Sequence, residues 1–188
     1  MNIHQLSVTY EPDQDRILVQ INTLAGEVLR VWLTRRLVIN LLPLLTREII
    51  HLEAGSAQLA SQDDATQKML MEFKKQAFIA QGDFKTPFNP RAAVFPIGPE
   101  PLLATSVHLT HAGSGALRIG FDEKLVAGGA ARGFEAALAS DLMHGFMHLL
   151  ESAIGLSNWG VLLASNPQAT LDDAEGKNSP SGPVRYMN

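Results

Sequence analysis

The chain contains no cysteine among its 188 residues. Disulfide bridges, thiol catalysis and thiolate zinc sites are therefore excluded, although the cellular compartment is not decided by this. Basic residues are also scarce, because 15 Lys and Arg stand against 19 Asp and Glu, for a formal net charge of −4. This balance argues against a broad cationic surface for nucleic acid or anionic lipid, and it leaves a local basic patch open.

Long apolar runs are missing as well. Even residues 37–45 are interrupted by Asn40 and Pro43, and no stretch approaches the roughly 20 apolar residues that a membrane span needs. The first fifteen residues lack a basic start followed by an apolar run, so we expect neither a secretory signal nor a membrane anchor. The composition therefore predicts a cytoplasmic protein without membrane contact.

Several catalytic patterns do not occur either. The sequence has no GxSxG and no GxxxxGK[ST], and its glycines at 113, 115, 128 and 129 fall in hairpin loops instead of a strand-to-helix phosphate loop. No serine stands in a recognisable nucleophile setting. We therefore expect no cofactor.

The chain does contain an internal similarity. Residues 34–49 (TRRLVINLLPLLTREI) match residues 139–154 (ASDLMHGFMHLLESAI) without a gap, at an offset of 105. The apolar positions coincide at the spacing of one buried helical stripe. The matched pairs are Leu37/Leu142, Leu41/Phe146, Leu44/Leu149, Leu45/Leu150 and Ile49/Ile154. Both segments are predicted to be amphipathic helices, with Thr34 and Ser140 as N-caps.

The similarity continues upstream of each helix. Residues 27–33 and 132–138 both alternate apolar and polar side chains, which is typical of a half-buried strand. Residues 16–22 and 116–121 match as a second strand, and residues 6–11 and 106–110 as a third, with turn-forming residues at 12–15 and 112–115. The predicted unit, strand, strand, strand, helix, therefore occurs twice.

This organisation predicts one duplicated domain over residues 1–164. Repeat one covers 5–58, a linker helix and proline-rich connection cover 59–101, repeat two covers 102–158, and a mobile polar tail covers 165–188. The linker helix is predicted from Asp63 or Asp64 to Gly82, with an apolar stripe of Met69, Phe73 and Ala77. Pro43 is expected to kink or interrupt the first helix, and residues 92–95 to form an edge strand.

The predicted fold class is α+β, with antiparallel sheets, a possible fourth strand in each repeat and the helices packed on one face. Two such units protect their open edges either by joining into one larger sheet or by packing face to face. This order of elements resembles the Whirly and Pur-alpha type of fold, in which repeats of antiparallel strands ending in a helix build single-stranded nucleic-acid binding proteins. The resemblance covers about 120 residues and includes no motif.

A candidate binding surface follows from the strand pattern. If Leu29, Val31 and Leu33 face the helix, the opposite face of the sheet carries cations beside an aromatic ring, a combination that stacks bases and contacts phosphates. The residues of this surface are Arg16, Leu18, Gln20, Arg30 and Trp32. The alternative interpretation is that the linker helix, the other half or a second subunit covers it.

Two other groups are candidate sites. Arg35 and Arg36 fall in the first helical turn, where free N–H groups and guanidinium groups suit an anion; pairing with an acid such as Glu27 is the alternative. The second helix carries Asp141, His144, His148 and Glu151 on one face, at a spacing that suits a metal ion or acid–base chemistry. An ordinary solvated face has the same pattern, so these four are weak metal candidates.

From the sequence we therefore expect a non-enzymatic binding or assembly module that forms a homo-oligomer through its sheet. The alternatives are single-stranded nucleic-acid binding through Arg16, Arg30 and Trp32, and a metal-dependent enzyme built on the second helix.

Overall fold

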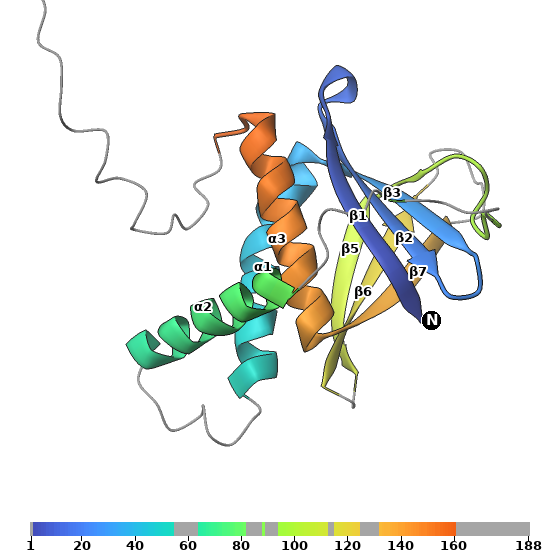
Figure 1. The fold of residues 1–188 in the computed structure, drawn as a ribbon. Helices are drawn as coiled ribbons and strands as arrows, with labels where there is room; N and C mark the ends of the chain where they lie inside the picture. Colours follow the sequence, from blue (N-terminus) through green and yellow to red (C-terminus); the bar gives the residue numbers. More distant parts are fainter. Residues whose placement is uncertain are drawn as a thin grey trace, which may run out of the picture.

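The computed structural model describes residues 2–54, 64–81, 88, 94–112, 115–124 and 132–160. The first half contains β1 (Ile3–Glu11), the short 3-10 helix η1 (Pro12–Gln14), β2 (Arg16–Thr23), β3 (Val28–Thr34) and α1 (Arg35–Ala54). Helix α2 (Asp64–Gln81) and the short strand β4 (Leu102–Leu103) follow, and β5 (Ser106–Ala112), β6 (Ala116–Glu123), β7 (Arg132–Ala139) and α3 (Ser140–Ser157) form the second half. The α+β class is confirmed, and the order strand, strand, strand, helix occurs twice (Figure 1).

The strand registers of the two halves are equivalent. In β2–β3 the inward pairs are Ile17/Leu33, Val19/Val31 and Ile21/Leu29. In β6–β7 the corresponding pairs are Leu117/Leu138, Ile119/Ala136 and Phe121/Phe134. These are the residues that the sequence match had placed in equivalent positions. The repeated order and register agree with a duplication, whose evolutionary origin stays a prediction.

The strands form two separate sheets. One has the order β1-β2-β3-β4 and the other β5-β6-β7, and all pairings are antiparallel except that of β4 with β3. Helices α1 and α3 lie beside each other on one side of the strands (Figure 1). The sequence left two arrangements open, one larger sheet or two sheets packed face to face. The described strands do not join into one continuous sheet.

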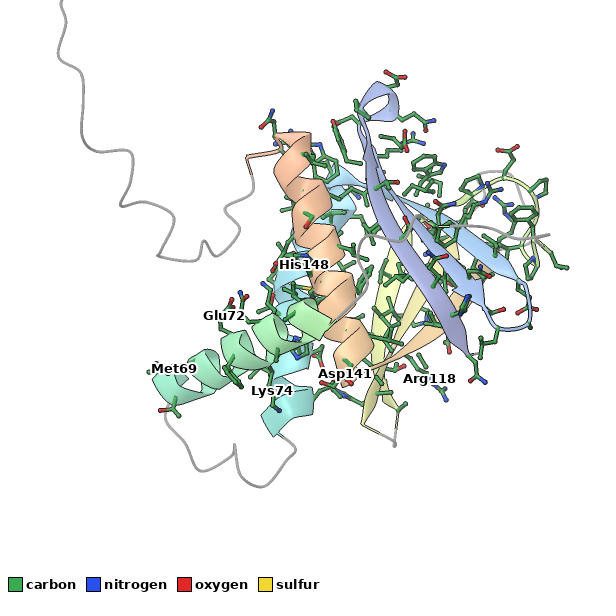
Figure 2. The ribbon with its side chains drawn as sticks, in the orientation of Figure 1. Met69, Glu72, Lys74, Arg118, Asp141 and His148 are labelled. Atoms are coloured by element: carbon green, nitrogen blue, oxygen red, sulfur yellow. The ribbon has the colours of Figure 1, made fainter. Side chains whose placement is uncertain are left out.

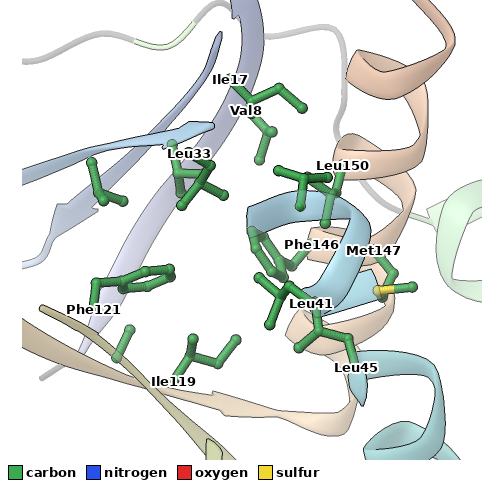
Figure 3. Close-up of a cluster of buried hydrophobic side chains, with 14 of the residues drawn as sticks. Val8, Ile17, Leu33, Leu41, Leu45, Ile119, Phe121, Phe146, Met147 and Leu150 are labelled. Atoms are coloured by element: carbon green, nitrogen blue, oxygen red, sulfur yellow. The ribbon is translucent and has the colours of Figure 1, made fainter. Parts of the chain in front are cut away.

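Both sheets and the helices α1 and α3 share one hydrophobic core (Figure 3). The four-stranded sheet contributes Val8, Ile17 and Leu33, the three-stranded sheet Ile119 and Phe121, and the helices Leu41, Leu45, Phe146, Met147 and Leu150. The helical stripes match as predicted in three pairs, because Leu41/Phe146, Leu45/Leu150 and Ile49/Ile154 are all buried. The two halves therefore stabilise each other through a common interior.

The helix starts agree only in part with the sequence prediction. The Thr34 hydroxyl accepts a hydrogen bond from the Leu37 amide at 3.4 Å, so Thr34 caps α1 as expected. Ser140 is not the N-cap of α3; it is the first helical residue, and Ala139 occupies the cap position without a side-chain bond. Helix α1 is also not interrupted, because Pro43 lies inside a single helix of 20 residues.

Helix α2 lies where it was predicted but faces differently from what its apolar stripe suggested. Met69 and Phe73 are 76% and 70% exposed. The helix meets α3 at Lys75, whose Nζ lies 2.8 Å from Glu151 Oε2. The predicted tail at 165–188 and the predicted end of the first helix at 55–59 lie outside the described residues. In the part of the chain that the structure describes, no helix combines the length and apolar character that a membrane crossing requires.

The connection after α2 links the two sheets. Val94 forms an isolated parallel bridge with Glu27, where an edge strand over 92–95 was expected. Strand β4 then pairs with β3, the Leu103 amide donates to Glu123 Oε1 at 3.0 Å, and the Thr105 amide donates to the Asp122 carbonyl at 2.8 Å. Residues 102–105 are therefore bonded to both sheets.

Candidate interaction surface

The outer face of the β2–β3 pair carries the five surface residues predicted from the sequence. Leu18 lies opposite Trp32, and Gln20 opposite Arg30, while Arg16 lies opposite Thr34 at the end of the ladder. The intervening residues Ile17, Val19 and Val31 are buried in the core. Because side chains alternate across a strand, the five predicted residues share the face that points away from the core, and all five are half-buried.

Arg30 is held by the proline-rich connection. Its guanidinium lies 4.5 Å from the centre of the Phe95 ring and donates to the Pro99 carbonyl. Its Nε is buried and has no hydrogen-bond partner in the described part of the chain. The bond to Pro99 uses one of the five N–H donors of the guanidinium, and the Phe95 ring covers one of its two faces.

Trp32 is partly covered by the same connection. Leu103 lies opposite it in the β3–β4 pair, and the Trp32 carbonyl accepts the Ala104 amide at 3.0 Å. On the other side, Thr9 of β1 lies opposite Leu18, and Glu11 lies opposite Arg16. The Leu18–Trp32 pair therefore forms an apolar strip with Leu103 at one end and Thr9 at the other. We call these four residues the Leu18–Trp32 strip.

Arg35, one of the two residues of the predicted anion site, begins α1 and is bonded to the chain just after α3. It donates to the Trp159 carbonyl at 2.9 Å, just after the end of α3. The Trp159 indole donates to Asp15 Oδ1 at 2.5 Å, and the Tyr10 hydroxyl donates to the same oxygen at 2.9 Å. We call Tyr10, Asp15, Arg35 and Trp159 the Trp159 cluster. Arg36 is exposed, and Glu27 hydrogen-bonds Thr23 within the β2–β3 turn instead of pairing with Arg35.

The hydrogen bonds of the Trp159 cluster shift two pKa values in opposite directions. Bonds from Trp159 and Tyr10, with the charge of Arg35, lower the pKa of Asp15 against a smaller desolvation effect. The hydrogen bond to Asp15, together with desolvation and the negative charge, raises the pKa of Tyr10. The Tyr10 and Trp159 rings meet edge to face at 5.8 Å. The cluster therefore joins the β1–β2 hairpin, the start of α1 and the end of α3.

The four candidate metal residues of α3 have different environments. Asp141 is exposed, His144 is buried, His148 is half-buried and Glu151 pairs with Lys75 of α2. Asp141 and His148 are well separated along the helix (Figure 2). No group of three or more His, Asp or Glu side chains within the described residues is placed to hold a metal ion. His144 in particular lies on the packed side of the helix, which the simple polar-face pattern did not indicate.

A histidine that was not among the predicted site residues lies on the edge strand β5, with its ring over the middle strand β6. His108 Nδ1 lies 3.2 Å from Asp122 Oδ2, and Nε2 lies 3.4 Å from Glu135 Oε1. The ring occupies space above Gly120, where an added Cβ would overlap the imidazole. A glycine inside a strand often marks such a close approach, so Gly120 was the available sequence signal. His111 similarly meets Glu48 of α1 at 2.6 Å.

The sequence matches no known protein family and no curated protein, and the fold matches no solved structure.

Proposed function

We propose that the protein is a non-enzymatic binding or assembly module that contacts a protein partner through the Leu18–Trp32 strip. The partner expected from the sequence is a second copy of the chain. The supporting observation is the cross-strand pairing of Leu18 and Trp32 on the outer face of the sheet, where both side chains keep part of their surface in water. An apolar centre with an aromatic residue and a polar border is the usual composition of a protein contact surface.

The neighbouring residues support a protein partner over a nucleic acid. Thr9 supplies a polar end to the strip, Gln20 lies beside it, and Glu11 lies directly opposite Arg16. Arg30 already stacks on Phe95 and donates to Pro99. The cations of this face therefore have partners or opposite charges close by, whereas a phosphate-binding surface needs cations free to replace counterions.

Concentration-dependent quenching of Trp32 tests the proposal. In a Trp159→Phe background Trp32 is the only indole, because the chain has two tryptophans. If a second copy covers the strip, acrylamide quenching falls as the protein concentration rises, and Leu18→Glu abolishes that fall. Quenching that is independent of concentration, and unchanged by Leu18→Glu, refutes self-association through the strip.

Single-stranded nucleic-acid binding is the second candidate, because Arg16 and Trp32 lie on the same partly accessible face. Titration of the same single-tryptophan protein with oligothymidine at two salt concentrations tests it. Binding predicts quenching that weakens with salt and weakens further in Arg16→Ala. Unchanged fluorescence at low salt rules this function out.

A further inference from the structure

Helix α2 carries two neighbouring apolar side chains that the described residues leave exposed. Met69 and Phe73 are one helical turn apart and largely exposed. Met69 lies at the end of α2 that points away from α1 and α3 (Figure 2). On the opposite side of the helix, Lys75 pairs with Glu151 of α3. Helices in proteins obtain most of their stability from packing apolar side chains, and Met69 and Phe73 of α2 remain in water.

Helix α1 carries a second exposed apolar face. Ile39 and Leu44 are 41% and 51% exposed, and the exposed ring of Pro43 lies between them in the sequence. Their neighbours Leu41 and Leu45 are buried in the core, so this face lies on the outer side of the helix. Contiguous exposed apolar residues of this kind usually mark an interaction site.

The two faces are complementary in charge and in length. The outer face of α1 carries the exposed cations Arg36 and Arg47, whereas that of α2 carries the exposed anion Glu72. At a rise of about 1.5 Å per residue, Ile39 and Leu44 are separated by about 7.5 Å along the helix axis, and Met69 and Phe73 by about 6 Å. The apolar pair of one helix therefore matches that of the other, with opposite charges beside them.

We propose that two copies of the chain form a symmetric dimer in which α2 of each copy packs on the outer face of α1 of the other. Within the described residues of one chain all four apolar residues stay exposed. A two-fold exchange covers both faces on both copies, so this contact closes on itself and does not propagate. It makes the α2–α1 contact twice, which enlarges a surface that is small for one helix pair. This dimer does not use the Leu18–Trp32 strip.

Sedimentation velocity of the full chain tests the exchange. In a Leu18→Glu background, which removes self-association through the Leu18–Trp32 strip, the protein is expected to sediment as a species of twice 20.4 kDa. The double variant Met69→Ser, Phe73→Ser and the double variant Ile39→Ser, Leu44→Ser are each expected to raise the dimer Kd at least ~10-fold. All four residues are exposed, so the variants should keep the wild-type circular dichroism. Glu72→Arg, which leaves the apolar residues in place, is expected to weaken the dimer in the same direction.

Mixing the two double variants identifies the arrangement. Each variant alone has no intact α2–α1 contact, but a mixed dimer has one, from α2 of the Ile39→Ser, Leu44→Ser chain and α1 of the Met69→Ser, Phe73→Ser chain. Equimolar mixing should therefore restore dimers that neither variant forms alone at that concentration. The matched control is Leu156→Ser, which removes an equally exposed apolar residue of α3 and should leave the dimer intact.

Three results overturn the proposal. A monomer at every accessible concentration in the Leu18→Glu background removes the dimer. A normal dimer of Ile39→Ser, Leu44→Ser shows that α2 pairs with α2 or with another surface. If mixing the two double variants does not restore dimers, the apolar faces of α1 and α2 do not meet. The Leu18→Glu variant, which tests the sheet strip, should dimerise normally here, so the two proposals fail separately.

Discussion

Removing the Glu123 carboxylate tests the junction between the two sheets. Glu123 is 9% exposed; its Oε1 accepts the Leu103 amide of β4 at 3.0 Å, and its Oε2 accepts Arg132 Nε at 2.8 Å. Arg132 also donates to the Ile97 carbonyl at 3.2 Å. One carboxylate therefore joins the connection, β6 and β7.

The expected loss of stability follows from burial. Breaking a buried ion pair by removing one partner costs about 3–5 kcal/mol. The Arg132 side chain keeps 34% of its surface in water, which lowers that cost, so we expect Glu123→Ala to reduce the free energy of unfolding by about 2–3 kcal/mol. Glu123→Gln keeps an acceptor for Leu103 and loses the charge, and about 1–2 kcal/mol is expected for it. Urea unfolding followed by circular dichroism measures both.

The pH dependence provides an independent check. Burial acts to raise the pKa of Glu123, but the Leu103 hydrogen bond and the Arg132 guanidinium outweigh it, so the pKa lies below its ordinary value. A carboxyl with a lowered folded pKa contributes stability above its unfolded pKa and loses it as the pH falls through the folded pKa. The difference between wild type and Glu123→Gln should therefore shrink on acidification. An equal difference at neutral and acidic pH, or a cost below about 0.5 kcal/mol for Glu123→Ala, would refute the reasoning.

Three further predictions concern local geometry. Gly133→Ala should lower the free energy of unfolding by about 1–3 kcal/mol, because its Cβ would lie 2.8 Å from the Phe121 carbonyl. Gly155→Ala should instead raise it by about 0.5–1 kcal/mol, because its Cβ would lie in open space on a helix. Equal effects of the two variants in thermal unfolding would contradict this. Thr34→Ala should lower the free energy of unfolding by about 1 kcal/mol, because α1 loses its N-cap. Ser140→Ala should lower it by less, because Ser140 is already a helical residue of α3. The reverse order in urea unfolding would reject the capping assignment. Trp159→Phe should raise the pKa of Asp15 by removing its strongest stabilising hydrogen bond, and an unchanged carboxyl titration by NMR would show that the indole has no such effect.

The elements and the core were predictable because their periodicity is local. Ile17 and Leu33 alternate with polar neighbours, and Leu41, Leu45 and Ile49 recur at helical spacing, so each strand and helix shows its buried face in its own sequence. The outer face with Leu18 and Trp32 followed from the same alternation.

Contacts between distant segments were not predictable in this way. The partners of Arg30 are Phe95 and Pro99, which lie in a proline-rich segment without any periodicity. In α2 the stripe residues Met69 and Phe73 are exposed, whereas Lys75 pairs with Glu151 of α3, and neither follows from the periodicity of the helix. The surroundings of His108 required the cross-strand register, because that register alone brings it over Gly120.

The path of the connection defines where this protein can be divided. By sequence the second repeat starts near Leu102, yet Leu102 and Leu103 complete the sheet of the first repeat. Complementing fragments cut at that apparent boundary would divide the connection, with Val94, which bridges to Glu27, on one piece and β4, which pairs with β3, on the other. A split or circularly permuted version must therefore open the chain before Val94. The segment that is hydrogen-bonded to both sheets then stays with the C-terminal piece and binds again when the two pieces meet.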